Sequence, residues 1–146
     1  GPGLVGAYIH HGGQLGVLVE VATEPEAVTG HSEFGELVHD IAMHIAAADP
    51  RFLRRTDVSA AVLDQEREIQ KARVIAEGKP EKVADKIVEG RLGKFFEEVC
   101  LYEQPFVKEN SLTIEQLIKQ KAAAAGGSIS VTRMARFKVG DTAAAE

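Results

Sequence analysis

The sequence predicts an α+β protein, in which a small antiparallel sheet of about three strands packs with helices and an antiparallel helical hairpin projects from this core. Strand-like segments stand near both ends of the chain and helical periodicity fills the middle, so the two kinds of element are segregated rather than alternating. The 146 residues, 45% of them hydrophobic, are enough for one compact core with a protruding element.

Two antiparallel strands are expected at residues 4–9 and 15–21, which are rich in Val, Leu, Ile and Tyr. The connector HHGGQ at residues 10–14 is short and contains glycine, which is typical of a β-hairpin. Residues 22–31 include a proline and a glycine and sustain neither periodicity, so we expect an exposed tip or a short, distorted helical turn there.

A helix is expected to begin at Ser32, whose hydroxyl can serve as the N-cap, with Glu33 and Glu36 near the positive end of the helix dipole. Pro50 lies just beyond its expected end. The apolar residues that recur at helical spacing are Phe34, Leu37, Val38, Ile41 and Ile45.

A second helix can start at Asp57 or Ser59 and run to about Glu77, where the sequence GKP at residues 78–80 ends it and begins a third. At about 1.5 Å per residue such a helix extends roughly 28 Å, far enough to project from a small core. Gly90 is expected to interrupt the third helix.

The C-terminal part is expected to hold an extended segment at residues 104–107 and a helix at residues 114–125, capped by Thr113 and stopped by a Gly-Gly pair. A final strand is expected at residues 128–139, with a kink near Arg133 and Met134.

These elements predict three regions. Residues 1–56 and 99–140 form the α+β core, residues 57–98 form the helical hairpin, and residues 141–146, with little to bury, form a disordered tail.

Charge and composition exclude several classes of protein. Charges of both signs sum to −5, which disfavours binding of nucleic acid through its phosphates, and a protein partner fits better. No apolar run approaches the length of a membrane span, so no membrane association is expected. A single cysteine cannot form an internal disulfide, which favours the cytoplasm or an organelle matrix. The initial Gly1-Pro2 looks like the scar of tag cleavage, so we expect a natural N-terminal segment to be missing.

Candidate catalytic groups are few. Asp40 and His44 stand four residues apart and could pair as carboxylate and imidazole, but a local structural pair is the commoner outcome without a nucleophile or metal set. His39 and His44, five apart, cannot share one helical face as metal ligands. Cys100 lies in an apolar run and reads as a buried thiol, with an intersubunit disulfide as the alternative.

No cofactor or metal site is expected. The Gly-Gly-Ser at residues 126–128 leads from a helix into a strand, whereas a phosphate-binding loop leads from a strand into a helix. His10 and His11 are expected to be solvated turn residues. The residues therefore predict a binding protein and not an enzyme.

Several segments, in this order, closely resemble the elongation factor Ts family over residues 3–140. They are GAYIHH (6–11), GVLVEV (16–21), HDIAMHIAA (39–47), GKP (78–80), IVEGRL (87–92) and QPFV (104–107). The resemblance implies a factor that binds elongation factor Tu and promotes release of GDP by inserting a wedge into its G domain, without a catalytic acid or base. It also implies a homodimer in which the helical hairpin takes part.

The resemblance suggests two sets of site residues. The partner-binding set is Glu24, Pro25, Glu26, Ala27, Val28, Met43 and His44, and the dimerisation set is Val62, Ile69, Val83 and Ile87. The family's N-terminal helical module, which also contacts elongation factor Tu, has no counterpart in these 146 residues.

Residues 22–31 depart from the family. The family usually carries a pattern close to NCETDFVARN, whose Asp-Phe pair forms the wedge, and this chain reads ATEPEAVTGH at the same length. Glu26 falls at the Asp position and Ala27 at the Phe position. Loss of an aromatic anchor commonly costs about 2 kcal/mol or more, and Pro25 restricts the backbone, so we expect weakened exchange. The alternative is a binding or assembly module that keeps the fold without exchange activity.

Overall fold

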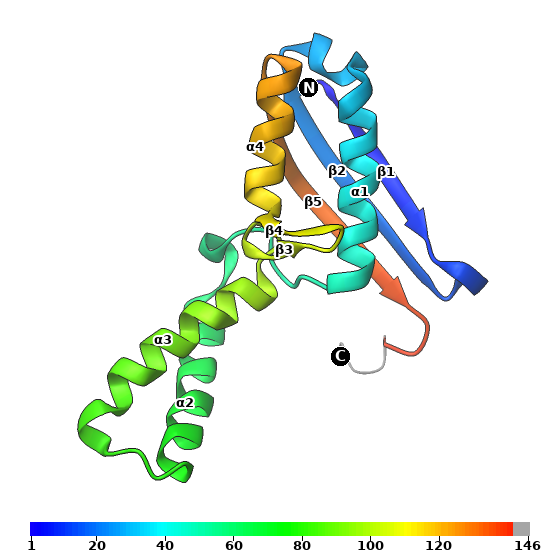
Figure 1. Ribbon diagram of the computed structural model, residues 1–146. Helices are drawn as coiled ribbons and strands as arrows, with labels where there is room; N and C mark the ends of the chain where they lie inside the picture. The colour runs from blue at the N-terminus through cyan, green and yellow to red at the C-terminus, as the bar shows by residue number, and fades with distance from the viewer. Residues whose placement is uncertain (142–146) are drawn as a thin grey trace.

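A computed structural model describes residues 1–141 of the chain, and Figure 1 shows the order of its elements. The strands are β1 (Gly3–Ile9), β2 (Leu15–Glu24), β3 (Pro105–Phe106), β4 (Glu109–Thr113) and β5 (Ser128–Lys138). The α-helices are α1 (Ser32–Ala48), α2 (Ala60–Ala76), α3 (Glu81–Val99) and α4 (Ile114–Ala125). Short 3-10 helices are η1 (His11–Gly13), η2 (Glu26–Gly30), η3 (Arg55–Asp57) and η4 (Leu101–Glu103).

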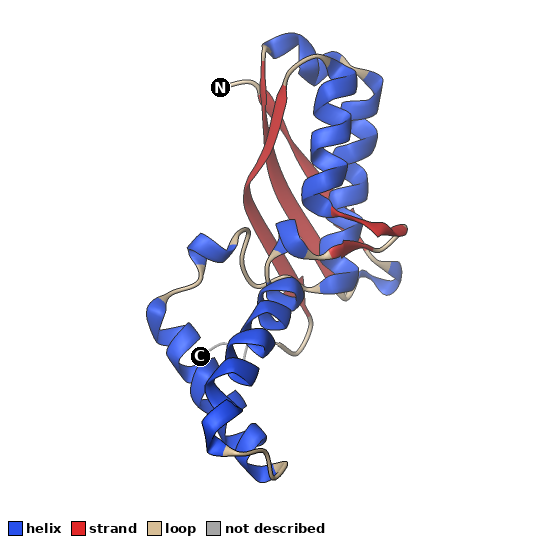
Figure 2. Cartoon of the chain, turned by 60° about the vertical axis from the view of Figure 1, so that its left-hand side comes forward, coloured by secondary structure: helices blue, strands red, loops and turns tan. Residues whose placement is uncertain are grey.

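The three long strands form one antiparallel sheet in the order β1-β2-β5, and β3 pairs with β4 in a separate two-stranded sheet. Helices α1 and α4 lie side by side on one face of the long sheet, as Figures 1 and 2 both show. Alternate residues of β2, Val17, Val19 and Val21, are buried beneath these helices. The predicted α+β class is confirmed.

The main core forms because α1 places one apolar stripe on this sheet. Phe34 and Ile41 are fully buried, together with Leu101 and Ile114 from the C-terminal half of the chain. Helix α1 packs on strands β1 and β2 and also contacts α4. Segments distant in sequence therefore share one core.

The start of α1 differs from the expectation. Its N-cap is His31, whose Nδ1 accepts a hydrogen bond from the backbone N–H of Glu33, and Ser32 is the first helical residue. The prediction of Ser32 as the cap was wrong by one position, because an imidazole acceptor at residue 31 can serve the first-turn amides as a hydroxyl would.

Helices α2 and α3 form the projecting antiparallel hairpin that the sequence predicts, as Figure 1 shows below the sheet. Ser59 caps α2 by accepting from the backbone N–H of Val62. The prediction that Gly90 interrupts the third helix was wrong, because α3 is continuous from Glu81 to Val99. Gly90 is exposed, and burial of the apolar stripe of α3 on both sides of Gly90 stabilises the helix. That stripe consists of Ala84, Val88, Leu92, Phe95 and Val99.

The C-terminal elements match the expectation closely. Thr113 and Gln116 form a capping box at the start of α4, and Gly126 ends the helix with a φ of 80°. In β5 the register shifts where Glu20 faces Arg133 and Val21 faces Val131, so the bulged residue is Thr132, one position before the expected kink.

Two regional predictions remain. Residues 142–146 of the expected tail lie outside the described residues. The division into a core and a hairpin stays a prediction, although the buried apolar residues of the hairpin do form clusters separate from the main core.

Candidate functional site

The segment from the last residue of β2 to the residue before α1, here called the tip (residues 24–31), is a short ordered turn at one end of the sheet. The backbone N–H of Val28 donates to the carbonyl of Pro25, and that of His31 donates to the carbonyl of Val28, both at 3.0 Å. The hydroxyls of Thr23 and Thr29 lie 2.7 Å apart and join the last residues of β2 to the end of η2. The tip therefore has a defined conformation.

The tip presents four of the predicted partner-binding residues together. Glu24, Pro25, Glu26 and Ala27 are all exposed, whereas Val28 is only 1% exposed and anchors the turn in the main core. The exposed stretch carries two carboxylates, one proline ring and one methyl group, and no aromatic side chain. It can meet a partner surface, but it offers little apolar area.

The other two predicted partner-binding residues lie elsewhere. Met43 is half-buried and His44 is fully buried, near the C-terminal end of α1, so the structure does not bring them to the tip. From residue 27 to residue 44 the chain crosses most of α1, which extends about 25 Å at 1.5 Å per residue. A buried His44 can affect a partner surface only through its neighbours.

His44 is held in one protonation state by two hydrogen bonds. The backbone N–H of Val107 donates to Nδ1 at 3.2 Å, so the ring proton lies on Nε2, which donates to Oε1 of Gln104 at 2.9 Å. Burial lowers the pKa of His44, and the bond to Gln104 opposes this shift. The predicted pair with Asp40 is not formed, because Asp40 accepts from Nζ of Lys108 at 3.2 Å instead.

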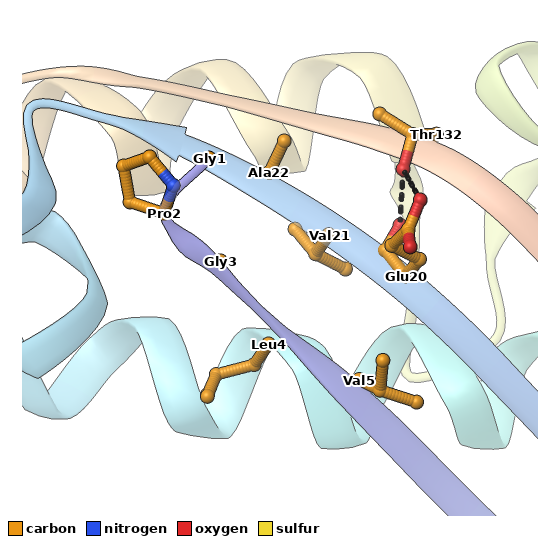
Figure 3. A pocket seen from close by; sticks show the side chains of 9 residues that line it. All are labelled: Gly1, Pro2, Gly3, Leu4, Val5, Glu20, Val21, Ala22 and Thr132. Atoms are coloured by element: carbon orange, nitrogen blue, oxygen red, sulfur yellow. Dashed lines mark hydrogen bonds between the residues drawn. The ribbon is translucent and has the colours of Figure 1, made fainter.

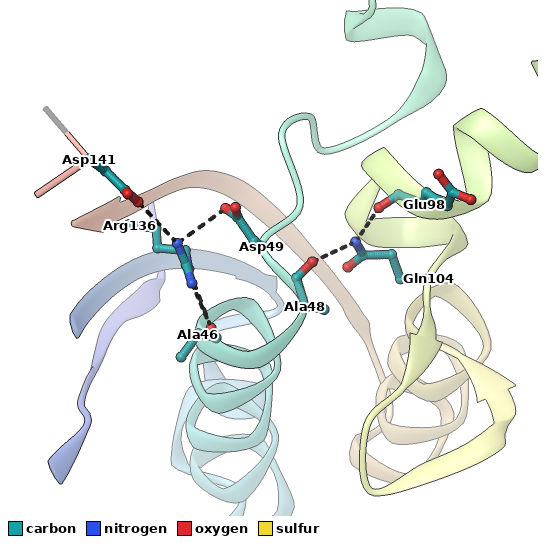
Figure 4. Close-up of polar contacts among 7 residues, drawn as sticks. All are labelled: Ala46, Ala48, Asp49, Glu98, Gln104, Arg136 and Asp141. Atoms are coloured by element: carbon teal, nitrogen blue, oxygen red, sulfur yellow. Dashed lines mark hydrogen bonds and ion pairs between the residues drawn. The ribbon is translucent and has the colours of Figure 1, made fainter. Parts of the chain in front are cut away.

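Gln104 joins three parts of the chain, as Figure 4 shows. Besides its bond to His44, its Nε2 donates to the carbonyl of Glu98 at 2.7 Å and to that of Ala48 at 3.4 Å. It therefore satisfies carbonyls near the C-terminal ends of both α1 and α3. This role of Gln104 was not predicted, since a glutamine in an extended segment carries no local signal for it.

Arg136 of β5 holds the same end of α1 from the other side, also seen in Figure 4. Its guanidinium donates to the carbonyl of Ala46 at 3.1 Å and lies 3.5 Å from Asp49 and 3.9 Å from Asp141. A cation at a helix C-terminus is favourable because it faces the negative end of the dipole.

The predicted dimerisation residues differ in exposure. Ile69 is 39% and Val83 is 41% exposed, whereas Val62 and Ile87 are half-buried and pack against the apolar clusters of the hairpin. Ile75, which was not predicted, is 52% exposed on α2. The hairpin therefore carries exposed aliphatic side chains.

The sheet face opposite α1 and α4 is a second exposed apolar surface, here called the open sheet face. Its main side chains alternate with the buried ones, namely Val5 and Ile9 of β1, Leu18 of β2 and Phe137 of β5, which are 51% to 67% exposed. The open sheet face was not predicted. Apolar residues at successive positions of a strand, which place apolar side chains on both faces of the sheet, were a possible signal for it.

Polar residues border the open sheet face where β2 meets the bulge of β5. Figure 3 shows the shallow pocket at this end, where the hydroxyl of Thr132 donates to the carboxylate of Glu20 at 2.7 Å. Hydrogen bonds from Arg133 and from Thr132 lower the pKa of Glu20. These groups pair with one another across the strands and so stabilise the edge of the surface.

Over residues 1–141, no group of three or more His, Cys, Asp and Glu side chains is arranged to hold a metal ion. No helix in that range is long and apolar enough to cross a membrane. Cys100 is fully buried, as predicted, and burial raises the pKa of its thiol to about 11.

Comparison with known proteins gives a family for this chain. The family model described as "Elongation factor TS" matches residues 1–141. A protein named elongation factor Ts from Solibacter usitatus (strain Ellin6076) is 63% identical over 139 residues, covering 95% of this chain and 66% of the relative. Elongation factor Ts from Koribacter versatilis (strain Ellin345) is 52% identical, covering 95% of this chain and 64% of the relative.

A third relative agrees with these two. Elongation factor Ts from Carboxydothermus hydrogenoformans is 50% identical over 139 residues and covers 95% of this chain. The chain spans 64% to 66% of the length of these three relatives, slightly under two thirds. With a family model matched over nearly all its residues, the chain belongs to the elongation factor Ts family.

Proposed function

We propose that the chain is a translation factor core that binds elongation factor Tu and promotes release of GDP through its tip, in the cytoplasm or an organelle matrix. Family membership supports this proposal, and the observation that carries it is the joint exposure of Glu24 to Ala27 on an ordered turn. These residues occupy the positions where the family carries its wedge.

The activity requires no catalytic side chain. A protein that binds the nucleotide-free state of its partner more tightly than the GDP-bound state lowers the partner's affinity for GDP by the same factor. A rigid tip suits this role, because it keeps its own conformation on insertion and displaces groups of the partner. The contacts that anchor Val28 and Thr29 supply such rigidity.

The composition of the tip favours weak exchange. Ala27 offers one methyl group where the family usually carries an aromatic ring, and the carboxylates of Glu24 and Glu26 flank it. The second candidate function, a binding or assembly module without exchange activity, is favoured by this one substitution.

The test is release of fluorescent GDP from elongation factor Tu, measured for the parent chain and for Ala27→Phe and Glu26→Asp. We expect the parent to accelerate release and Ala27→Phe to accelerate it further, on the order of thirtyfold, since an aromatic anchor contributes about 2 kcal/mol. Ala61→Phe, at an exposed position of α2, is the matched control and should release GDP as the parent does.

Two outcomes would separate the candidates. A tight complex without faster release by the parent chain would reject exchange and favour the binding module. Absence of any complex, even with Ala27→Phe, would reject elongation factor Tu as a partner of these 146 residues.

We also propose that the chain forms a homodimer through the exposed aliphatic side chains of the hairpin, Ile69 and Val83. The open sheet face is the second candidate interface, favoured by the higher exposure of Leu18 and Phe137. Burying such side chains against a second copy removes apolar area from water.

Light scattering of matched double variants distinguishes these surfaces. Loss of the dimer in Ile69→Glu/Val83→Glu alone would support the hairpin, and loss in Leu18→Glu/Phe137→Glu alone would support the open sheet face. A parent chain that is monomeric at high concentration would reject both.

A further inference from the structure

Gly127, in the turn between α4 and β5, lies directly against the tip. A Cβ atom built on Gly127 would stand 2.1 Å from the carbonyl oxygen of Glu24, 2.6 Å from Cγ2 of Val28 and 2.9 Å from Cδ of Pro25. Carbon atoms in contact are ordinarily about 3.5 Å or more apart, so all three positions conflict with a side chain here. The tip, which is proposed to meet the partner, thus packs against a residue without a side chain.

The conflict cannot be relieved by rotating a side chain alone. The nearest atom is a backbone oxygen at the end of β2, where Glu24 pairs with Ser128 in the sheet. Pro25 has a fixed ring, and Val28 is buried and β-branched, so rotation about its χ1 is restricted. Relief therefore requires movement of backbone.

The turn that carries Gly127 is held from the helix side. The backbone N–H of Gly127 donates to the carbonyl of Ala122 at 3.0 Å, and that of Gly126 donates to Ala123 at 3.2 Å. Together these bonds and the left-handed Gly126 form the Schellman arrangement that ends α4. Because the turn is fixed by α4, added volume at residue 127 acts on the tip.

We propose that Gly127 is a positioning residue of the tip, and that its lack of a side chain sets where Glu24 to Val28 stand on the molecule. This inference rests on the proposed function of the tip for its consequence, but the placement itself does not. A displacement of about 1 Å in a positioned group can lower a rate by up to a hundredfold. Under the proposed function, position 127 thereby affects exchange through the placement of the tip.

The test compares Gly127→Ala with Gly126→Ala in the whole chain. Gly126 has a φ of 80°, and a Cβ there would meet nothing within 4 Å, so its variant strains the same turn without touching the tip. We expect both variants to lower the melting temperature. In NMR spectra, we expect the amide resonances of residues 26–30 to move in Gly127→Ala and to keep their parent positions in Gly126→Ala.

The effect on exchange is measured as the maximal rate of GDP release and as the concentration that gives half of it. We expect Gly127→Ala to lower the maximal rate on the order of tenfold and Gly126→Ala to leave it at the parent value. Unmoved tip resonances in Gly127→Ala would overturn the proposal. Moved resonances with parent exchange would support the placement and reject the tip as the exchange element.

A coupling measurement covers the case in which Gly127→Ala folds poorly. Val28→Ala removes one of the conflicting atoms, so the loss of melting temperature caused by Gly127→Ala should be smaller in the Val28→Ala background than in the parent. Additive losses would show that residues 28 and 127 do not compete for space, and would overturn the proposal.

Discussion

His44 shows how one buried side chain acquires a pH dependence from its hydrogen bonds. Its Nδ1 accepts from the N–H of Val107, so the imidazolium form would place two donors against each other. Asp40, on the same helix as His44, and Lys108, next to Val107, pair with one another at 3.2 Å. The neutral ring is therefore the form that the fold accommodates.

The first prediction follows from this lowered pKa. The unfolded chain binds a proton at His44 near pH 6.5, whereas the folded chain binds it only at lower pH. The contribution of His44 to the free energy of unfolding is therefore fully present above about pH 6.5 and is lost as the pH decreases below it. The free energy of unfolding in urea should fall more between about pH 7.5 and about pH 5.5 for the parent than for His44→Gln. His39→Gln, at an exposed position of the same helix, should behave as the parent does. Equal losses in the parent and His44→Gln would contradict the assignment.

Cys100 supplies the second prediction at this scale. Its thiol is fully buried and its pKa is raised to about 11, so almost no reactive thiolate is present near neutral pH. A chromogenic disulfide reagent should label the folded chain far more slowly than the chain in guanidinium chloride. Rapid labelling of the folded chain would mean that the thiol is accessible, which an intersubunit disulfide would require.

Among the elements, α3 shows that packing overrides a weak local signal. A helical glycine costs up to about 1 kcal/mol relative to alanine, which is less than the gain from burying the apolar stripe of α3 against α2. Glu77 also accepts a bidentate pair from Arg91 and Glu89 accepts from Arg67, and both contacts join the two helices. The hairpin is therefore continuous although its sequence suggests a break.

Gly90→Ala should stabilise the chain by about 0.5–1 kcal/mol, because the position is exposed and helical. A Cβ there would meet nothing within 4 Å. Denaturant unfolding measures the gain, and Gly126→Ala, at a left-handed residue, should change stability in the opposite direction. A loss at residue 90 would indicate that Gly90 has a packing role that the structure does not show.

At the scale of the whole molecule, the apolar interior is divided. The main core lies between the sheet and helices α1 and α4, while the far end of the hairpin depends on a small cluster around Val74, Ala84 and Val88. Regions with few buried contacts open at lower free energy than the core. The end of the hairpin is therefore expected to open without unfolding of the sheet.

Native-state hydrogen exchange tests this division. Amides at the far end of α2 and α3 should exchange faster than those of β2. Val74→Ala should lower the free energy of opening of the hairpin by roughly 2 kcal/mol and so speed exchange of the hairpin amides alone. Val21→Ala, in the main core, should speed exchange throughout the chain. Uniform protection of hairpin and sheet in the parent would contradict separate opening.

Much of the fold follows from local patterns. The N-terminal hairpin, the cap at Thr113 and the end of α4 were predicted, and Ser59 was one of two predicted starts of α2, because each depends on residues close together in the chain. The positions of the candidate site followed from the resemblance of ordered motifs. The small β3-β4 sheet was not predicted as a sheet, and only an extended segment was expected at residues 104–107. A strand of two residues, as β3 is, is too short to show strand periodicity.

Residue identity and local spacing were enough to indicate the family, the order of the elements and the unusual composition of the tip. Tertiary structure alone decided that Val28 anchors the tip, that His44 pairs with Gln104 and not Asp40, that α3 runs through Gly90, and that Gly127 stands against Glu24. Each of these depends on burial or on contacts between segments far apart in the chain, where packing free energy exceeds local preference.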